Sequence, residues 1–222
     1  MNRGYKSHSR IISRRTPEDF TPDGNLAKPA WREARWARFD DDPFRRKRHI
    51  RAQTAVATLW TPRTLYLGYR CRYVVLNVFH GENPTKEKMG LWNRDVVEAF
   101  LNPQPRHMDH YYEFEVAPNN LWIDLEINLQ KNPTYDARWN SGFEHATTIN
   151  RARRFWTCEM RIPVASLGVQ ALREGMAWRG NFYRATGFGD DAHRSFLCWS
   201  PVHGLRKPNF HVPEFFGLID FA

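Results

Sequence analysis

Five carboxylates lie close to aromatic residues in three short segments of the chain, a combination that suits ligands rich in hydroxyl groups. They are Glu98, Glu113, Glu115, Asp124 and Glu126. Carboxylates accept hydrogen bonds from hydroxyls, and aromatic rings cover the apolar C–H faces of a sugar. A pair of carboxylates at a suitable separation can instead hydrolyse a glycosidic bond. These residue types predict either a saccharide-binding surface or a glycan-active enzyme.

Other chemistries have weaker support. The sequence contains no GxSxG, HExxH, CxxC or phosphate-binding glycine loop, and its nine histidines are scattered. The stretches "DDD" at 40–42 and "GDD" at 189–191 could offer loop carboxylates to Ca²⁺, although solvated turns are the simpler interpretation. Cys71, Cys158 and Cys198 are widely spaced and odd in number, which favours buried free thiols over a zinc site or a disulfide framework.

The net charge of +9 is concentrated in two segments. Residues 1–15 carry five Lys or Arg and no acid, and "PFRRKRHIR" at 43–51 carries five more and no acid. The rest of the chain is therefore close to neutral. Solvated segments are the simpler interpretation, and a basic domain that binds an anionic polymer is the alternative. We expect no nucleic-acid partner.

The elements that position the carboxylates have the period-two alternation of β-strands. The segment 111–118 sets Tyr112, Phe114 and Val116 against Tyr111, Glu113 and Glu115, and 121–129 sets its leucines and isoleucines against Trp122, Asp124 and Glu126. If the two polar faces coincide opposite the core, carboxylates and aromatics share one surface. A concave surface of this kind suits a polyhydroxylated ligand, whereas a convex one is only a solvated sheet. Further strands are expected at 52–60, 64–73, 95–102, 155–163, 178–187, 194–201 and 216–221, with a first strand near 35–39 and a helical turn at 162–168.

Many short strands separated by Pro, Gly and Asn clusters, without βα alternation, predict an all-β antiparallel β-sandwich with an irregular N-terminal segment. We expect a basic tail at 1–18 and one domain at 19–222. No apolar run reaches the length of a membrane span, and the first fifteen residues lack the apolar stretch of a secretory signal. The chain as given is therefore expected to be cytoplasmic and off the membrane, while its export and its oligomeric state are open.

A series of segments resembles the family 9 carbohydrate-binding modules and their stand-alone relatives, in order, over about residues 20–222. The segments are "TPDGNLAKPAWREA", "AVATLWTPRTLYLGYRC", "LWNRDVVEAFLNP", "YYEFEVAPNN", "WTCEMRIPVASLG", "WRGNFYRATG" and "PNFHVPEFFGLIDF". The resemblance implies a sandwich of the DOMON-like or jelly-roll-like kind with no catalytic activity. It also implies a saccharide ligand, such as the end of a plant cell-wall glycan, structural Ca²⁺ nearby, and relatives that are often extracellular.

The resemblance also implies roles for individual residues. Trp92 falls on the first stacking tryptophan of the family and Glu98 on its sugar-binding glutamate, while Phe210 stands where the second tryptophan would be. Glu115 replaces a sugar-binding arginine, so a donor becomes an acceptor, and Arg184 is a candidate for the missing donor. Alternatives stay open: Trp92 as an aromatic at the edge of the core, Glu98 as a buried acid paired with Arg184 or Arg94, and Phe210 as packing for the C-terminal segment.

Overall fold

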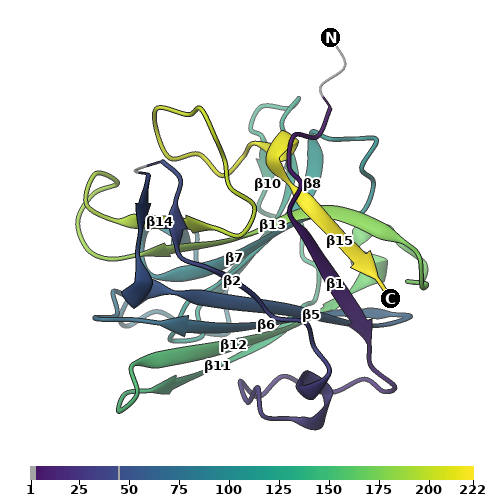
Figure 1. The fold of residues 1–222 in the computed structure, drawn as a ribbon, viewed down its shortest axis with the longest axis horizontal. Helices are drawn as coiled ribbons and strands as arrows, with labels where there is room; N and C mark the ends of the chain where they lie inside the picture. The colour runs from purple at the N-terminus through teal and green to yellow at the C-terminus, as the bar shows by residue number, and fades with distance from the viewer. Residues whose placement is uncertain (1–3, 45) are drawn as a thin grey trace.

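The computed structural model describes residues 4–44 and 46–222, and the strands in them form two sheets packed face to face (Figure 1). The first sheet has the order β10 (Tyr135–Asp136), β9 (Trp122–Asn128), β8 (His110–Val116), β7 (Val96–Asn102), β13 (Ala177–Thr186), β15 (Gly217–Phe221) and β1 (Arg10–Arg15), with β14 (Ser195–Cys198) also on β13. The second has β1, β5 (Thr54–Thr61), β6 (Thr64–Arg72), β12 (Phe155–Pro163) and β11 (Glu144–Asn150), with β2 (Ala37–Phe39) on β5.

The remaining elements are short. A two-stranded hairpin pairs β3 (Asp41–Asp42) with β4 (Lys47–Arg48). The 3-10 helices are η1 (Pro29–Arg32), η2 (Ile50–Ala52), η3 (Leu91–Asn93), η4 (Val164–Leu167) and η5 (Pro213–Phe215), and no α-helix occurs in the described residues. The all-β sandwich is confirmed, and so is the helical turn expected after the strand at 155–163.

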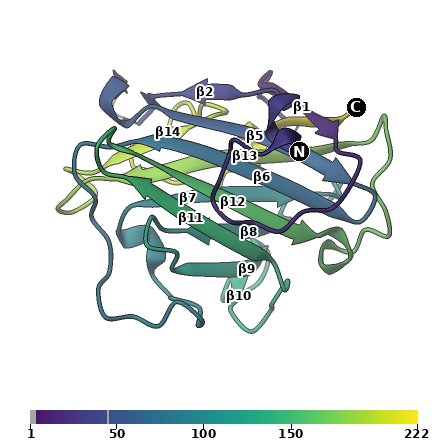
Figure 2. The ribbon, with the colours of Figure 1, turned by 90° about the horizontal axis from the view of Figure 1, so that it is seen from below.

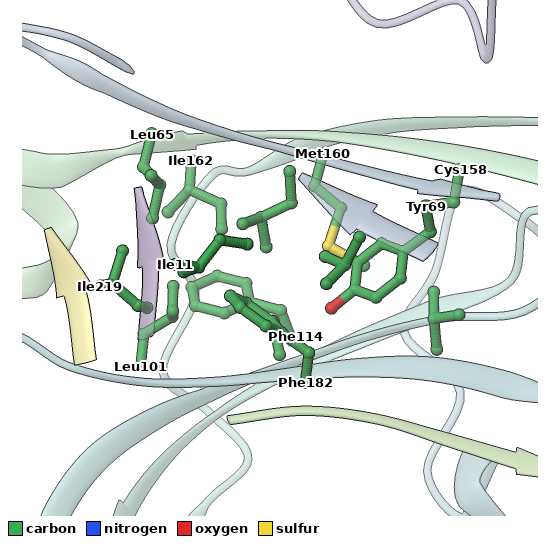
Figure 3. Packing of buried hydrophobic residues seen from close by; sticks show 14 of the residues in the cluster. Ile11, Leu65, Tyr69, Leu101, Phe114, Cys158, Met160, Ile162, Phe182 and Ile219 are labelled. Atoms are coloured by element: carbon green, nitrogen blue, oxygen red, sulfur yellow. The ribbon is translucent and has the colours of Figure 1, made fainter. Parts of the chain in front are cut away.

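The core lies between the two sheets, where period-two alternation turns apolar side chains inward. Leu65, Cys158, Met160 and Ile162 of the second sheet point toward Phe114 and other side chains of the first sheet (Figure 3). In Figure 2, β11 and β12 pass in front of β7 and β8, so the layers are stacked in this view. Cys71, Cys158 and Cys198 are free and buried, as predicted, and burial raises the pKa of the Cys71 thiol to about 11.

The predicted N-terminal tail at 1–18 contains a strand. Arg10–Arg15 forms β1, which runs parallel to β15 through its first residues and parallel to β5 through its last two, and thereby joins the sheets at one edge (Figure 1). Ile11 is only 3% exposed and belongs to the core. Residues 10–15 are thus part of the sandwich rather than a solvated tail. Residues 1–3 of the tail, and Arg45 of the basic loop, lie outside the described residues.

The segment between β1 and β2 covers the outer face of the second sheet, because it carries its own apolar side chains. Leu26 and Trp31 pack on Leu59 and Tyr66. Gly68 lies beneath the Trp31 ring, where an added Cβ would come within 2.9 Å of that ring, so only glycine fits there. This cover explains why β5 and β6 are buried on both faces over most of their length.

Candidate functional site

A pocket of about 410 Å³ lies on the outer face of the first sheet, the face turned away from the second sheet. Its floor comes from β7 and β8 and includes three glutamates, Glu98, Glu113 and Glu115. Its walls come from loops and include Trp92, Arg194, Phe210 and His211. The structure therefore brings together four of the five predicted site residues: Trp92, Glu98, Glu115 and Phe210.

The three glutamates meet because of strand register. Glu98 of β7 is the direct antiparallel partner of Glu115 of β8, and Glu113 lies two residues away on the same face. Each offers a carboxylate oxygen, and these three oxygens lie within 4.8 Å of one another. The side chains are 2%, 3% and 0% exposed for Glu98, Glu113 and Glu115, respectively. Like charges directly opposite each other destabilise a sheet, so this arrangement is costly to the fold.

Electrostatics at the floor disfavour ionisation of Glu98 and Glu115. Burial, followed by the charge on Glu113, raises the pKa of Glu98 well above its ordinary value. Burial, followed by the charges on Glu98 and Glu113, does the same to the pKa of Glu115. The guanidinium of Arg194 opposes both shifts without overcoming them. The floor thus favours the approach of hydrogen-bond donors or positive charge.

Trp92 stands at the rim on the short helix η3. Gly90 precedes η3 with φ of 78°, a left-handed conformation that glycine adopts without strain. The turn buries Leu91 completely and leaves Trp92 36% exposed. The indole is therefore not buried in the core, and the alternative of a core-edge aromatic is not supported.

Arg194 holds this rim in place from the loop before β14. Its Nη2 donates hydrogen bonds to the backbone carbonyls of Trp92 (2.6 Å) and Arg94 (2.9 Å). The side chain is 3% exposed and lies over the Phe196 ring, with the guanidinium carbon 5.2 Å from the ring centroid. Arg194 is a site residue that sequence reasoning missed. Period-two alternation puts it on the face of Phe196 and Cys198, but only the tertiary fold turns that face toward the pocket.

Phe210 and His211 close the pocket from the segment before η5. The Phe210 ring stacks on Tyr183 at a centroid distance of 4.0 Å and an interplanar angle of 12°. The Tyr183 hydroxyl also donates to the Phe210 carbonyl at 3.0 Å. His211 lies beside Phe100, and its Nδ1 is 2.8 Å from the Tyr111 hydroxyl. Phe210 therefore packs the C-terminal segment and lines the pocket at the same time.

Arg184 does not reach this pocket, contrary to the sequence expectation. It follows Tyr183 on β13, so alternation turns it to the inner face of the sheet. There its Nη1 donates to the Arg72 carbonyl at 2.8 Å, and its guanidinium lies 5.6 Å from the Trp156 ring centroid. The pairing of Glu98 with Arg184 or Arg94 is absent as well: no ion pair of Glu98 occurs among the described residues. Arg194 is the arginine that the fold supplies to the site.

The polar faces of β8 and β9 do not coincide, which corrects a second expectation. Glu113 and Glu115 pair with Leu125 and Ile123, so the apolar face of β9 borders the glutamates. Asp124 is turned to the other face, where its carboxylate accepts hydrogen bonds from the Ser141 backbone and hydroxyl. Glu126 is bonded to His110 at 2.8 Å. Neither Asp124 nor Glu126 joins the cluster.

The loops considered for Ca²⁺ do not fit a cation. Asp40 is held by two hydrogen bonds of 3.0 Å from Arg48, and Asp42 accepts one from the Phe196 backbone. Asp190 accepts one hydrogen bond from the backbone N–H of Ala192 and pairs with His193 at 2.7 Å. Their carboxylates already have protein partners. The structural Ca²⁺ implied by the resemblance therefore has no support at 40–42 or 189–191.

The two basic segments are partly neutralised by acids of the domain. Arg10 forms an ion pair with Asp220, and Arg48 with Asp40. They lie on β1 and β4, which separates them in the fold. Among the described residues, no helix is long and apolar enough to cross a membrane.

Comparison with known proteins connects this geometry to a family. A family model described as carbohydrate-binding family 9 matches residues 61–221, which include Trp92, the three glutamates, Arg194 and Phe210. A curated protein of Arthroderma benhamiae, described as an extracellular protein, is 27% identical over 181 residues, covering 77% of this chain and 79% of that protein.

Solved structures share the fold. A Bacteroides uniformis protein, provisionally assigned to carbohydrate binding, superposes with a TM-score of 0.75 at 22% identity and covers 97% of this chain and 100% of its own. A family 9 module from Caldicellulosiruptor kristjanssonii in complex with cellotriose gives 0.67 at 16% identity, covering 96% of this chain and 93% of its own. The same organism's module in complex with glucose gives 0.65 at 15%, with 96% and 95% covered.

Proposed function

Because the chain belongs to carbohydrate-binding family 9, we propose that it binds a saccharide in the pocket between Trp92 and Phe210 and does not cleave it. The observation that carries the proposal is an exposed indole at the rim of a pocket that has carboxylates on its floor. Aromatic walls with a few buried polar groups are typical of specific small-ligand sites, and the volume of about 410 Å³ is within their usual range.

In this proposal, the rings of Trp92 and Phe210 contact the apolar faces of the sugar. The Tyr183 ring stacked under Phe210 fixes the orientation of that ring, so little side-chain entropy is lost when a ligand binds. Phe210 offers less area than a tryptophan at the same place would. We therefore expect Trp92 to provide the larger share of the stacking energy.

The polar half of the proposed contact comes from the floor. Glu98 and Glu115 would accept hydrogen bonds from sugar hydroxyls, and Arg194 takes the place that Arg184 was expected to fill as the positive group near them. With Glu115 where the family has an arginine, the site offers more acceptors than a typical member. The Caldicellulosiruptor kristjanssonii modules bind cellotriose and glucose. We accordingly propose a glucose-containing oligosaccharide as the first ligand class to test.

Hydrolysis is the competing function for the same carboxylates. Glycosidases place two carboxyl groups on opposite sides of the scissile bond. Glu98 and Glu115 are direct partners on adjacent strands and lie side by side on one floor, so a sugar can approach them from one side only. We propose binding without turnover. Release of chromophore from aryl glycosides by the wild type, lost in Glu98→Gln, would contradict this.

The proposal is tested by calorimetric titration of the wild type with gluco- and xylo-oligosaccharides. Trp92→Ala should weaken binding by about 1–3 kcal/mol, or about 5- to 150-fold, because the stacked ring is removed. Phe188→Ala is the matched control, since Phe188 is 55% exposed and does not line this pocket. A wild type that binds none of the sugars on a broad glycan array would end the proposal, and equal losses in both variants would remove Trp92 from it.

A further inference from the structure

The three glutamates on the floor of the pocket lack the donors that buried carboxylates normally have. Oε1 of Glu98, Oε2 of Glu113 and both carboxylate oxygens of Glu115 have no hydrogen-bond partner among the described residues. A buried ionised group without a partner is strongly unfavourable. The cluster of Glu98, Glu113 and Glu115 therefore destabilises the fold unless a positively charged group binds to it.

A fourth buried glutamate shows how the same chain treats a purely structural carboxylate. Glu159 is fully buried and accepts hydrogen bonds from four groups, the backbone of Asp23 and Gly24, the Lys28 ammonium and the Trp31 indole, at 2.7–2.8 Å. The floor glutamates are as buried, yet their oxygens are left open. The contrast indicates that a ligand, rather than the fold, completes their coordination.

Arg194 does not fill this role. Its Nη2 is committed to the carbonyls of Trp92 and Arg94, and its Nη1 is 3.5 Å from Asp191. His211 comes nearer, with Nε2 4.0 Å from Oε2 of Glu113, which is beyond hydrogen-bond reach. Arg194 still contributes its positive charge to the site. The three negative charges of the ionised glutamates equal the one positive charge of its guanidinium plus the two of a divalent ion.

We propose that Glu98, Glu113 and Glu115 bind one divalent cation, with Ca²⁺ as the occupant, on the floor of this pocket. The three carboxylate oxygens lie within 4.8 Å of one another. Ca²⁺ takes six to eight oxygen ligands at about 2.3–2.6 Å, so two of its ligands can be up to about 5 Å apart. Three carboxylates leave coordination positions open toward the pocket. Resting on the proposed function, we infer further that saccharide hydroxyls occupy them, so that saccharide affinity depends on Ca²⁺.

The test uses the full chain after removal of metal with EDTA, and Ca²⁺ alone as the probe. Calorimetry should show one Ca²⁺ per chain. Tb³⁺ should give luminescence when tryptophan is excited, because Trp92 lines the same pocket, and Ca²⁺ should quench it by displacement. Glu115→Gln should weaken Ca²⁺ binding by about 100-fold or more. Loss of a residue that only hydrogen-bonds to a metal ligand already costs about 10- to 100-fold, and Glu115 is proposed as a direct ligand. Glu126→Gln removes a carboxylate from the same sheet outside the cluster and should leave the affinity unchanged.

Folding of the variant is checked by thermal denaturation in EDTA, where Glu115→Gln should melt no lower than the wild type because it relieves repulsion among like charges. Added Ca²⁺ should raise the melting temperature of the wild type and of Glu126→Gln only. No Ca²⁺ binding up to about 10 mM, well above the weakest known protein sites, overturns the proposal. Equal weakening in Glu126→Gln overturns it as well. Glucosamine, a sugar with an ammonium group, is the competing positive ligand. If it binds in EDTA, Glu115→Gln abolishes that binding and Ca²⁺ does not bind, the cluster holds an amino group and not a metal ion.

Saccharide titrations then separate the two parts. An affinity that falls at least about tenfold in EDTA and returns with Ca²⁺ supports the linkage, since one such factor is about 1.4 kcal/mol of coupling. An affinity that is the same in EDTA overturns the linkage but not the metal site. Ca²⁺ binding without any saccharide binding contradicts the proposed function and leaves the metal site standing.

Discussion

Arg194 connects the charged floor of the pocket with its exposed aromatic rim. One side chain donates to the carbonyls of Trp92 and Arg94 and lies near Glu98, so it sets both the position of the indole and the local charge. Burial and neighbouring charges both affect its pKa. Desolvation lowers the pKa of Arg194, and the negative charges of Asp191 and Glu98 oppose that shift.

We expect Arg194→Met to weaken saccharide binding by about tenfold or more, because two hydrogen bonds from a charged donor, each worth about 1.5–3 kcal/mol, no longer hold the Trp92 turn. Calorimetric titration with the ligand of the wild type measures the effect. Arg206→Met, at an exposed position outside this pocket, is the control. If Arg194→Met binds as tightly as wild type, the rim does not depend on this side chain.

His145 gives the fold a dependence on pH away from the pocket. Burial among Trp122 and Phe143 lowers the pKa of His145 to about 4. In the unfolded chain the imidazole titrates at its ordinary value of about 6.5. Below that pH the unfolded state takes up a proton that the folded state refuses, so stability falls between about pH 6.5 and 4.

We expect the wild type to lose up to about 3 kcal/mol over this range relative to His145→Gln, as the shift in pKa implies. Urea denaturation at pH 7, 5.5 and 4.5 of both proteins isolates the contribution, because every other group is shared. His107→Gln, which removes an exposed imidazole, should follow the wild type. Parallel pH profiles for the wild type and His145→Gln would contradict the assignment.

At the scale of elements, Glu159 of β12 is the anchor for the segment that covers the second sheet. Its carboxylate accepts hydrogen bonds from the backbone of Asp23 and Gly24 and from the side chains of Lys28 and Trp31. The "DG" and the "W" of the segment "TPDGNLAKPAWREA" therefore bind the same carboxylate from two ends of that segment. Sequence alone does not connect them to a glutamate more than a hundred residues away.

Glu159→Gln should lower the free energy of unfolding by about 3 kcal/mol, because an amide cannot accept from four donors and the Lys28 ammonium loses its partner. Urea denaturation measures the change. Glu144→Gln is the matched control, since Glu144 is paired with Arg161 at an exposed position where an ion pair contributes less than about 1 kcal/mol. Equal losses in the two variants would show that the four hydrogen bonds of Glu159 contribute no more stability than one exposed ion pair.

The sequence correctly predicted the strands that bury one face in the core. It did not show how the polar faces of neighbouring strands are oriented relative to each other. The alternation in β8 and β9 marks both strands correctly, yet only the pairing of Glu115 with Ile123 shows that their polar faces are opposed. β11 was missed because its residues are half-exposed throughout and carry no clean apolar alternation. In the site, Trp92, Glu98, Glu115 and Phe210 were predicted through family resemblance, whereas Arg194 depends on contacts between distant segments that no local pattern encodes.

At the scale of the molecule, β1 connects the two sheets. It was predicted as part of a basic tail because four of its six residues are Arg or Ser, and its apolar Ile11 and Ile12 are too few for a period. Parallel pairing with β15 and β5 is a tertiary event, and it buries Ile11 while leaving Ile12 38% exposed.

Ile11→Ala should therefore cost about 2–4 kcal/mol of stability, as truncation of a buried isoleucine does. Its neighbour supplies the control, since Ile12→Ala alters an exposed position and should cost less than about 0.5 kcal/mol. Chemical denaturation of both variants compares them directly. Similar, small losses at the two positions would mean that β1 contributes no core contact in solution.

The pairing of β1 with β15 also constrains the order of events during synthesis. Arg10 pairs with Leu218, more than two hundred residues later. Until β15 has left the ribosome, residues 10–13 of β1 have no strand to pair with, and the edge of β13 that β15 covers stays open. Such edges can recruit strands from other nascent chains. The contact that completes the first sheet is therefore one that the growing chain can make only at the end of its synthesis.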